Sequence, residues 1–204
     1  SEYRYRTPVV SDGTLFVAIS QSGETADTLA AMNVAKKLDY LAMMTICNAP
    51  ESSMVRQSDL AVMTNAGPEI GVASTKAFTT QLTVLALLSI ALARRAGLEE
   101  KQEQKFVAQL SDLPKISKQI LSMDESIKLL AKNFVDKDNI IFLGRGTQNA
   151  IAMEAALKLK ETSYIHAEAY AAGELKHGPL AMVDEDMPVV TVAPDNDLFK
   201  KLKR

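Results

Sequence analysis

Residues 15–29 constrain the fold of this 204-residue chain more than any other stretch. They read LFVAISQSGETADTL: a short apolar run, a small polar loop with one glycine, and the beginning of a helix. The apolar run is typical of a buried parallel strand. A strand that turns tightly into a helix directs unpaired backbone N–H groups and the positive end of the helix dipole at the loop. The sequence therefore predicts an anion site there.

The loop supplies neutral hydrogen-bond donors for such an anion. Ser20, Ser22 and Thr25 carry hydroxyls and Gln21 an amide, and these groups suit the oxygens of a phosphate monoester. No Lys or Arg lies in the loop, so neutral groups would hold the phosphate. A simple capping loop, with Ser22 or Thr25 as the N-cap, explains the same residues without a ligand. From the spacing alone both interpretations stay open.

Composition argues against several classes of protein. Twenty-three basic and 25 acidic residues give a net charge of -2, so we expect no nucleic-acid partner. The single cysteine, Cys47, ends an apolar run and is expected to be a buried structural thiol. With two histidines and no cluster of ligating residues, we expect no metal and no cofactor. The longest apolar stretch, near 82–93, reads as too short to span a bilayer, so we expect no membrane partner and a cytoplasmic location.

Short apolar strands alternate with helices along the first half of the chain. Strands are expected at 15–19, 41–47 and 60–64, and helices at 25–38, 52–57 and from 74 to 94 or 95. This alternation predicts an α/β fold with a parallel sheet and right-handed crossovers. The loop at 65–73 follows the third strand, at the carboxyl edge where open α/β sheets bind ligands.

Residues 98–135 carry no strand signal, and their apolar spacing predicts two helices kinked near Pro114 and a third from about 124 to 134. The strand and helix pattern then restarts, with strands at 139–143 and 188–192, a helix at 147–161 and another helix from Asp197.

The predicted organisation is two incomplete copies of one nucleotide-fold-like lobe. The first lobe covers residues 1–97, a helical connector covers 98–137, and the start of a second lobe covers 138–204. Because the sequence starts abruptly and stops inside a helical pattern, we expect a fragment of a longer chain.

A second group of candidate residues lies on the predicted helix at 147–161. Glu154, Lys158 and Glu161 are spaced i, i+4 and i+7, which stacks them on one helix face. A solvated ladder of ion pairs explains this spacing equally well. After the helix, residues 163–179 crowd acids, bases and both histidines among Gly, Ala and Pro. His177 is expected on a short turn there, where a structural histidine is the alternative.

Three of these stretches resemble a known family. Residues 20–28 (SQSGETADT) are similar to the phosphate loop of the sugar isomerase (SIS) domain family. Residues 69–81 (EIGVASTKAFTTQ) and 168–179 (EAYAAGELKHGP) resemble the isomerase part of the glutamine–fructose-6-phosphate aminotransferases, also called glucosamine-6-phosphate synthases. The match is spread over nearly the whole chain.

The resemblance implies two SIS lobes of flavodoxin-like topology and a site for fructose 6-phosphate. It implies that fructose 6-phosphate is converted to glucosamine 6-phosphate with ammonia from glutamine. In that family the phosphate is bound by the positions that match Ser20, Gln21, Ser22 and Thr25. The sugar chain is met by the positions that match Val72 and Ser74.

The family also implies catalytic roles. The position matching Glu161 moves a proton between C1 and C2, and those matching Lys158 and His177 assist through charge stabilisation and ring opening. The histidine comes from the neighbouring subunit, so a homodimer is implied. The residue types suit this chemistry independently, because one carboxylate can reach both carbons and Lys158 lies one turn from Glu161.

The sequence departs from the family pattern in three ways. It holds no glutaminase part, no opening strand with a further phosphate-side serine, and no C-terminal tail with the lysine that forms an imine. We therefore expect this piece alone to be inactive, with the glutaminase domain of the full-length chain as its partner. Two alternatives stay open: a non-catalytic SIS module that senses a sugar phosphate, and another SIS sugar-phosphate isomerase or deglycase.

Overall fold

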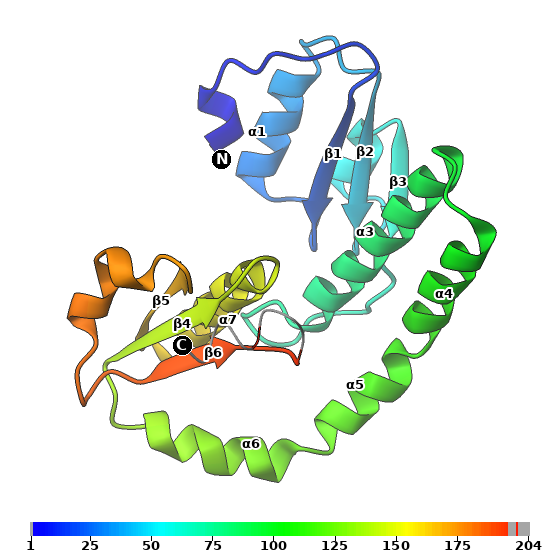
Figure 1. Ribbon diagram of the computed structural model, residues 1–204. Helices are drawn as coiled ribbons and strands as arrows, with labels where there is room; N and C mark the ends of the chain where they lie inside the picture. The colour runs from blue at the N-terminus through cyan, green and yellow to red at the C-terminus, as the bar shows by residue number, and fades with distance from the viewer. Residues whose placement is uncertain (1, 196–198, 200–204) are drawn as a thin grey trace. The chain divides into compact units, whose positions relative to one another are not determined.

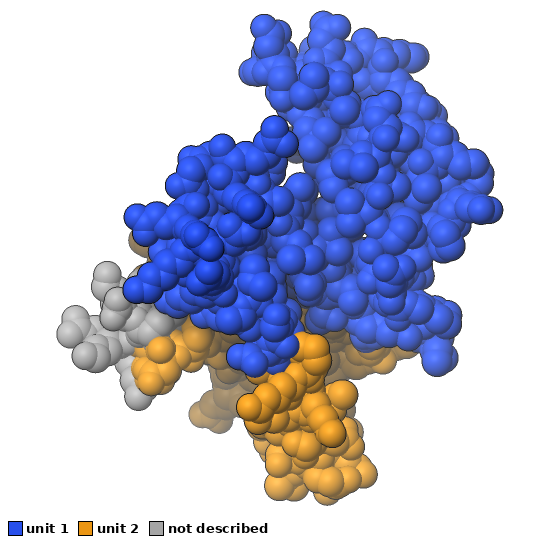
Figure 2. Space-filling view, turned by 90° about the vertical axis from the view of Figure 1, so that its right-hand side faces the viewer, with its two compact units in different colours: residues 1–113 blue, residues 114–204 orange. Residues whose placement is uncertain are grey.

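The computed structural model describes residues 2–195 and 199, and the chain divides into two compact units, Ser1–Leu113 and Pro114–Arg204, coloured separately in Figure 2. The division falls inside the stretch that the sequence predicts as a helical connector.

The first unit contains a three-stranded sheet that is parallel, as predicted, and its strand order is β1-β2-β3 (Figure 1). Its strands are β1 (Leu15–Ser20), β2 (Ala42–Cys47) and β3 (Leu60–Met63). Ser20 pairs with Cys47, and Cys47 pairs with Met63, so the three strands end at one common edge of the sheet. The loops that leave this edge carry the candidate phosphate and sugar residues.

Five helices accompany this sheet in the described residues: η1 (Glu2–Tyr5), α1 (Ala26–Ala35), α2 (Ser53–Gln57), α3 (Lys76–Arg95) and α4 (Glu100–Ser111). Buried Ala18, Met32, Met43 and Met54 form the core between sheet and helices. Helix α1 ends before the predicted Leu38, because its last turn tightens into bonds from the 37 and 38 amides to carbonyls three residues back.

Helix α3 begins two residues after the predicted residue 74, and it is long and apolar enough to cross a membrane by length and composition. It runs for 20 residues. One window of 18 residues within it has a mean hydropathy of 1.5, and 6% of that window is buried. The expectation of a stretch too short to span a bilayer is therefore wrong on length, because Thr83 and Ser89 bond to carbonyls four residues back and do not interrupt the helix. Length and composition alone equally fit a core helix of a soluble protein.

The second unit begins with the predicted helices and then forms its own sheet. Helix α5 (Leu113–Leu121) starts beside Pro114, where proline is tolerated, and α6 (Asp124–Ala131) continues into η2 (Lys132–Phe134). The strands β4 (Asn139–Gly144), β5 (His166–Ala171) and β6 (Val189–Val192) are parallel, in the order β5-β4-β6 (Figure 1). The predicted helix from Asp197 lies outside the described residues.

The strand β5 is missing from the predicted elements. His166, Glu168 and Tyr170 alternate along it with Ala167 and Ala169, and the two alanines belong to the face that packs on the core. Alanine gives a weak apolar signal, so the period of two is easily overlooked in the sequence. The run that crowds acids and a histidine is therefore a strand.

Helix α7 (Gln148–Ser163) packs closely on the second sheet because its contact residues are small. Ala152 and Ala156 are buried against Ile140 and Phe142 of β4. At Gly144 a Cβ atom would lie 2.1 Å from the Gln148 carbonyl oxygen, so only glycine lets the helix begin this near the strand. At its other end the helix extends two residues beyond the predicted Glu161, to Ser163, and Tyr164 follows in a left-handed conformation.

Candidate functional site

The loop 20–25 connects β1 to α1, and its own hydroxyls shape it. The buried Ser20 Oγ accepts a hydrogen bond from the Gly23 amide at 3.0 Å and lies 3.4 Å from Thr25 Oγ1. Ser22 Oγ accepts from the Glu24 amide at 3.2 Å. Both serine oxygens are thus used as acceptors, while the hydroxyl hydrogen of Ser22 has no acceptor among the described residues and stays available as a donor.

The loop is also hydrogen-bonded to the segment that follows β2. The Gly23 carbonyl accepts from the Met54 amide at 3.0 Å, and the Gln21 carbonyl accepts from the Asn48 amide at 3.3 Å. Gly23 has φ of +67°, and a Cβ atom there would lie 2.0 Å from Ser52 Oγ. Glycine is therefore required at this position both for its backbone angle and for space.

The carboxylate of Glu24 makes a further hydrogen bond between the loop 20–25 and this segment. Glu24 Oε1 accepts a hydrogen bond of 2.6 Å from the Ser53 amide at the start of α2. This bond, with a smaller contribution from Arg56, holds the pKa of Glu24 below its ordinary value of 4.5. The loop 20–25 is therefore held in one shape by residues 48–54.

The amino end of α1 is open to an anion. Thr25 is the N-cap in an extended conformation, and no side chain caps the first-turn amides. The acidic first-turn residue, Asp27, lies 3.1 Å from Arg4, which offsets its charge. Unpaired amides beside the exposed Ser22 and Thr25 hydroxyls form the kind of site that binds a phosphate.

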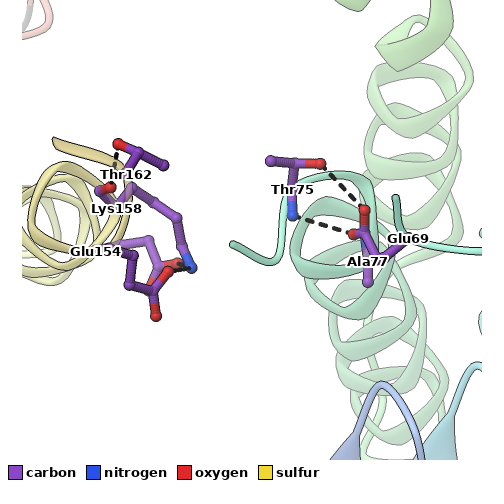
Figure 3. Close-up of polar contacts among 7 residues, drawn as sticks. Glu69, Thr75, Ala77, Glu154, Lys158 and Thr162 are labelled. Carbon is purple, nitrogen blue, oxygen red and sulfur yellow. Dashed lines mark hydrogen bonds and ion pairs between the residues drawn. The ribbon is translucent and has the colours of Figure 1, made fainter. Parts of the chain in front are cut away.

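The amino end of α3, in contrast, already holds an anion from the chain itself. Glu69 Oε1 accepts from the amides of Thr75 at 3.1 Å and Ala77 at 2.8 Å, and Glu69 Oε2 accepts from Thr75 Oγ1 at 3.3 Å (Figure 3). These bonds, that of Ala77 first, hold the pKa of Glu69 below its ordinary value. At the amino end of α1, in contrast, no side chain among the described residues bonds to the first-turn amides.

The candidate sugar residues lie between Glu69 and this helix. Val72 is fully exposed, Ser74 is half-buried, and Ala73 between them is buried. They follow β3 at the same sheet edge from which the loop 20–25 leaves β1. The first unit therefore presents both predicted binding segments at one edge, where ligands of parallel sheets bind.

The charged residues predicted to share a face of α7 do lie together. Lys158 Nζ is 2.7 Å from Glu161 Oε2. It is also 3.5 Å from Glu154 Oε1, and Figure 3 labels Lys158 and Glu154. The hydrogen bond to Glu161 is the main cause that raises the pKa of Lys158 above its ordinary value of 10.5. A ladder of ion pairs has the same geometry, so these contacts alone do not distinguish the two interpretations.

His177 lies at the end of η3 (Leu175–His177), ahead of η4 (Pro179–Met182), on the predicted short turn. Its amide donates to the Glu174 carbonyl at 3.0 Å. The exposed imidazole makes no hydrogen bond or ion pair within residues 2–195. The structure therefore does not bring His177 to Lys158 and Glu161 within this chain.

The rest of the crowded run is hydrogen-bonded along β5. His166 Nδ1 lies 3.0 Å from Asn139 Oδ1, and His166 Nε2 lies 3.6 Å from Glu168 Oε1. The Tyr170 hydroxyl donates to Glu168, and this bond raises the pKa of Tyr170. The polar side chains of β5 thus bond to one another and to Asn139. The predicted catalytic carboxylate and lysine lie instead on α7.

Sequence reasoning missed the roles of Glu24 and Glu69. A capping box pairs residues three apart, whereas Glu69 caps amides six and eight residues away. No local spacing indicates such a bond. Cys47 is fully buried as expected, with Sγ 3.6 Å from Ser52 Oγ, and no metal-binding cluster occurs among the described residues.

Comparison with known proteins places this geometry in a family. The model of the SIS domain matches residues 1–91 and 133–203. Glutamine–fructose-6-phosphate aminotransferase [isomerizing] of Escherichia coli K12 is 61% identical over 203 residues, which is 100% of this chain and 33% of that protein. The same identity and coverage hold for the protein of that name from Salmonella typhi. The chain thus spans about a third of the length of the curated relatives it matches.

Solved structures agree. The C-terminal domain of glucosamine-fructose-6-phosphate aminotransferase from Francisella tularensis has a TM-score of 0.95 and 54% identity, covering 98% of this chain and 57% of that one. A glucosamine-6-phosphate deaminase from Thermotoga maritima has a TM-score of 0.76 and 26% identity, covering 98% of this chain and 61% of that one. These structures share the fold of this chain, and the chain belongs to the SIS domain family.

Proposed function

We propose that this chain is part of the isomerase domain of a glutamine–fructose-6-phosphate aminotransferase. It binds fructose 6-phosphate, and the complete enzyme converts this ketose with glutamine-derived ammonia to glucosamine 6-phosphate, a step of amino-sugar synthesis. Identity of 61% over the whole chain to proteins of that name supports the assignment. The observation that carries the chemistry is the pairing of Lys158 with Glu161 at 2.7 Å on α7.

The phosphate binds at the loop 20–25. The uncapped amides of α1 and the hydroxyls of Ser20, Ser22 and Thr25 supply the donors, together with Gln21. The carboxylate of Glu69 fills the corresponding place at α3, which directs a ligand anion to α1. The sugar chain then lies toward Val72 and Ser74, which leave the same sheet edge.

Glu161 acts as the acid/base that carries a proton between C1 and C2 of the open sugar. A single carboxylate can reach two adjacent carbons, which is what ketose–aldose isomerisation requires. Lys158 remains an ammonium well above neutral pH because Glu161 and Glu154 raise its pKa. Its positive charge stabilises the negative charge that develops when the C–H proton leaves.

His177 opens the sugar ring from a neighbouring subunit, so the active form is a homodimer. The exposed imidazole, which has no polar partner within residues 2–195, is available for such a role. Histidine suits ring opening because it titrates near neutral pH. The other partner is the glutaminase domain of the full-length chain. The enzyme works in the cytoplasm.

We propose the same organisation that the sequence predicts for the chain. Residues 1–97 and 138–204 belong to two SIS lobes, and residues 98–137 connect them. A sugar-phosphate sensor of the SIS type would keep the loop 20–25 but would have no need for Glu154, Lys158 and Glu161 together.

The test is Glu161→Gln in the full-length enzyme. The variant should keep its affinity for fructose 6-phosphate and lose the isomerisation of the sugar, measured by proton exchange at C1 and C2. Glu125→Gln is a matched control, because Glu125 lies 4.0 Å from Lys128 in an exposed pair on α6. Undiminished exchange in Glu161→Gln would refute the assignment, and loss of exchange in both variants would point to a general structural effect.

A further inference from the structure

We propose that Glu69 is a positioning residue for sugar binding: by closing residues 70–74 against the first turn of α3, it holds Val72 and Ser74 in place. The inference rests on the proposed function, since it takes these two residues as contacts of the sugar chain. It concerns only the first unit.

The contacts of Glu69 span both ends of the segment. Glu69 lies just before residue 70, and its carboxylate binds Thr75 and Ala77 just after residue 74 (Figure 3). Both carboxylate oxygens are engaged, and the two bonds to amides measure 3.1 and 2.8 Å. A bidentate contact of this kind fixes direction as well as distance.

No other hydrogen bond restrains residues 70–74 among the residues that the structure describes. Ile70 and Val72 are 95% and 101% exposed, so packing hardly restrains them either. Only Ala73, at 8% exposure, is anchored by burial. The position of the segment therefore depends on the Glu69 carboxylate at its ends and on Ala73 in its middle.

The placement of the charge has a second consequence. A helix N-terminus attracts anions, and the 20-residue α3 is the longest helix among the described residues. Since the Glu69 carboxylate already lies against the N-cap amide of Thr75 and the first-turn amide of Ala77, the phosphate of a ligand is not drawn there. Glu69 thus orients the ligand in two ways, by holding the sugar-side segment and by excluding the phosphate from α3.

A cap that only stabilises α3 would behave differently from a positioning residue. Loss of such a cap would lower the melting temperature and would affect all ligands alike. Loss of a positioning residue would weaken a ligand that reaches residues 70–74 and would spare one that binds only at the loop 20–25. Inorganic phosphate is such a small probe, because it carries the anion without the sugar chain.

The experiment compares Glu69→Ala and Glu69→Gln in the full-length enzyme. For Glu69→Ala we expect KM for fructose 6-phosphate to rise about tenfold, while the inhibition constant of inorganic phosphate changes less than about twofold. Glu69→Gln keeps an oxygen that accepts from both amides, so its KM should stay within about threefold of the parent value. Glu100→Ala, which removes an exposed first-turn carboxylate of α4, is the control and should change neither constant.

The two constants separate the outcomes. An unchanged KM in Glu69→Ala, or an equal loss of phosphate and fructose 6-phosphate binding, would overturn the positioning role. If Glu69→Ala does not fold, Thr75→Ala decides, because it removes only the Thr75 hydroxyl bond and should raise KM to a smaller extent with phosphate inhibition unchanged. A parent enzyme that does not act on fructose 6-phosphate would instead contradict the proposed function itself.

Discussion

The ammonium of Lys158 lies 2.7 Å from the Glu161 carboxylate, three residues further along α7. Glu154, one turn earlier, places a second carboxylate oxygen 3.5 Å from the same nitrogen. The three side chains are only partly exposed, with 27%, 35% and 26% of their surfaces accessible for Lys158, Glu161 and Glu154. The positive charge of Lys158 therefore lies next to Glu161, the proposed acid/base, where both side chains are partly shielded from water. Solvent screens the electrostatic interaction less there than on an open surface.

Replacing this ammonium tests its part in the reaction. In the full-length enzyme, Lys158→Met should lower kcat by about 10²- to 10³-fold, because the developing negative charge loses its stabilising cation. Steady-state kinetics with fructose 6-phosphate measure the effect. Lys128→Met removes a lysine from a similar i, i+3 pair on α6 and should leave kcat unchanged. Equal kcat values for the two variants would show that the charged residues on α7 form only a surface ladder of ion pairs, with no part in catalysis.

The shape of the loop 20–25 depends on Gly23. In Gly23→Ala the new Cβ would lie 2.0 Å from Ser52 Oγ on a backbone with φ of +67°, so we expect a loss of about 2–4 kcal/mol in the free energy of unfolding and weaker phosphate inhibition. Gly13→Ala is the matched control, because Gly13 has φ of +74° with nothing within 4 Å of its Cβ position. It should cost about 1–2 kcal/mol, from backbone strain alone.

Urea unfolding and phosphate inhibition together check this prediction. If Gly13→Ala destabilised the protein as much as Gly23→Ala, crowding against Ser52 would have no part in the effect. If Gly23→Ala bound phosphate as well as the parent, the anion would have to bind elsewhere than at this loop.

Local signals in the sequence are sufficient to predict elements and contacts that neighbours in the chain determine. The strand–loop–helix turn at 15–29 lies within a few residues of its predicted bounds, because each element is set by neighbours in the chain. The same holds for the i, i+4, i+7 spacing that brings Lys158 to Glu154 and Glu161. Turn and helix geometry determine these contacts, so one sequence reveals them.

Contacts made across loops could not be predicted in this way. Glu69 bonds to amides six and eight residues later, and Glu24 to the amide of Ser53, 29 residues later. Whether such side chains meet depends on how the loops bring distant parts of the backbone together. The spacing of residues in the sequence does not indicate this. His177 illustrates the same limit, because its predicted turn is present while its imidazole contacts none of the predicted partners in this chain.

Acid should weaken the protein through the two capping glutamates. The pKa values of Glu24 and Glu69 are lowered from 4.5, mainly by the amides of Ser53 and Ala77 respectively. Carboxylates with lowered pKa values stabilise the fold above the pKa of the unfolded chain, and this stabilisation is lost as the pH falls through the folded pKa. The parent should therefore exceed the Glu24→Gln, Glu69→Gln double variant in stability at neutral pH, and the difference should shrink below about pH 4.5.

Thermal unfolding of the parent and the double variant, followed from about pH 7 to about pH 3, measures that difference. Single variants separate the two contributions. A difference that stays constant over the whole range would show that neither carboxylate is held ionised by its helix amides.

The central claim is that this chain carries a sugar-phosphate site at the loop 20–25. The most direct measurement is the melting temperature of the protein with fructose 6-phosphate and, in parallel, with fructose. A ligand that binds only the folded state raises the melting temperature, so we predict a rise with the phosphate ester, none with the free sugar, and loss of the rise in Gly23→Ala. Equal shifts with both sugars, or none with fructose 6-phosphate in the full-length enzyme, would contradict the account.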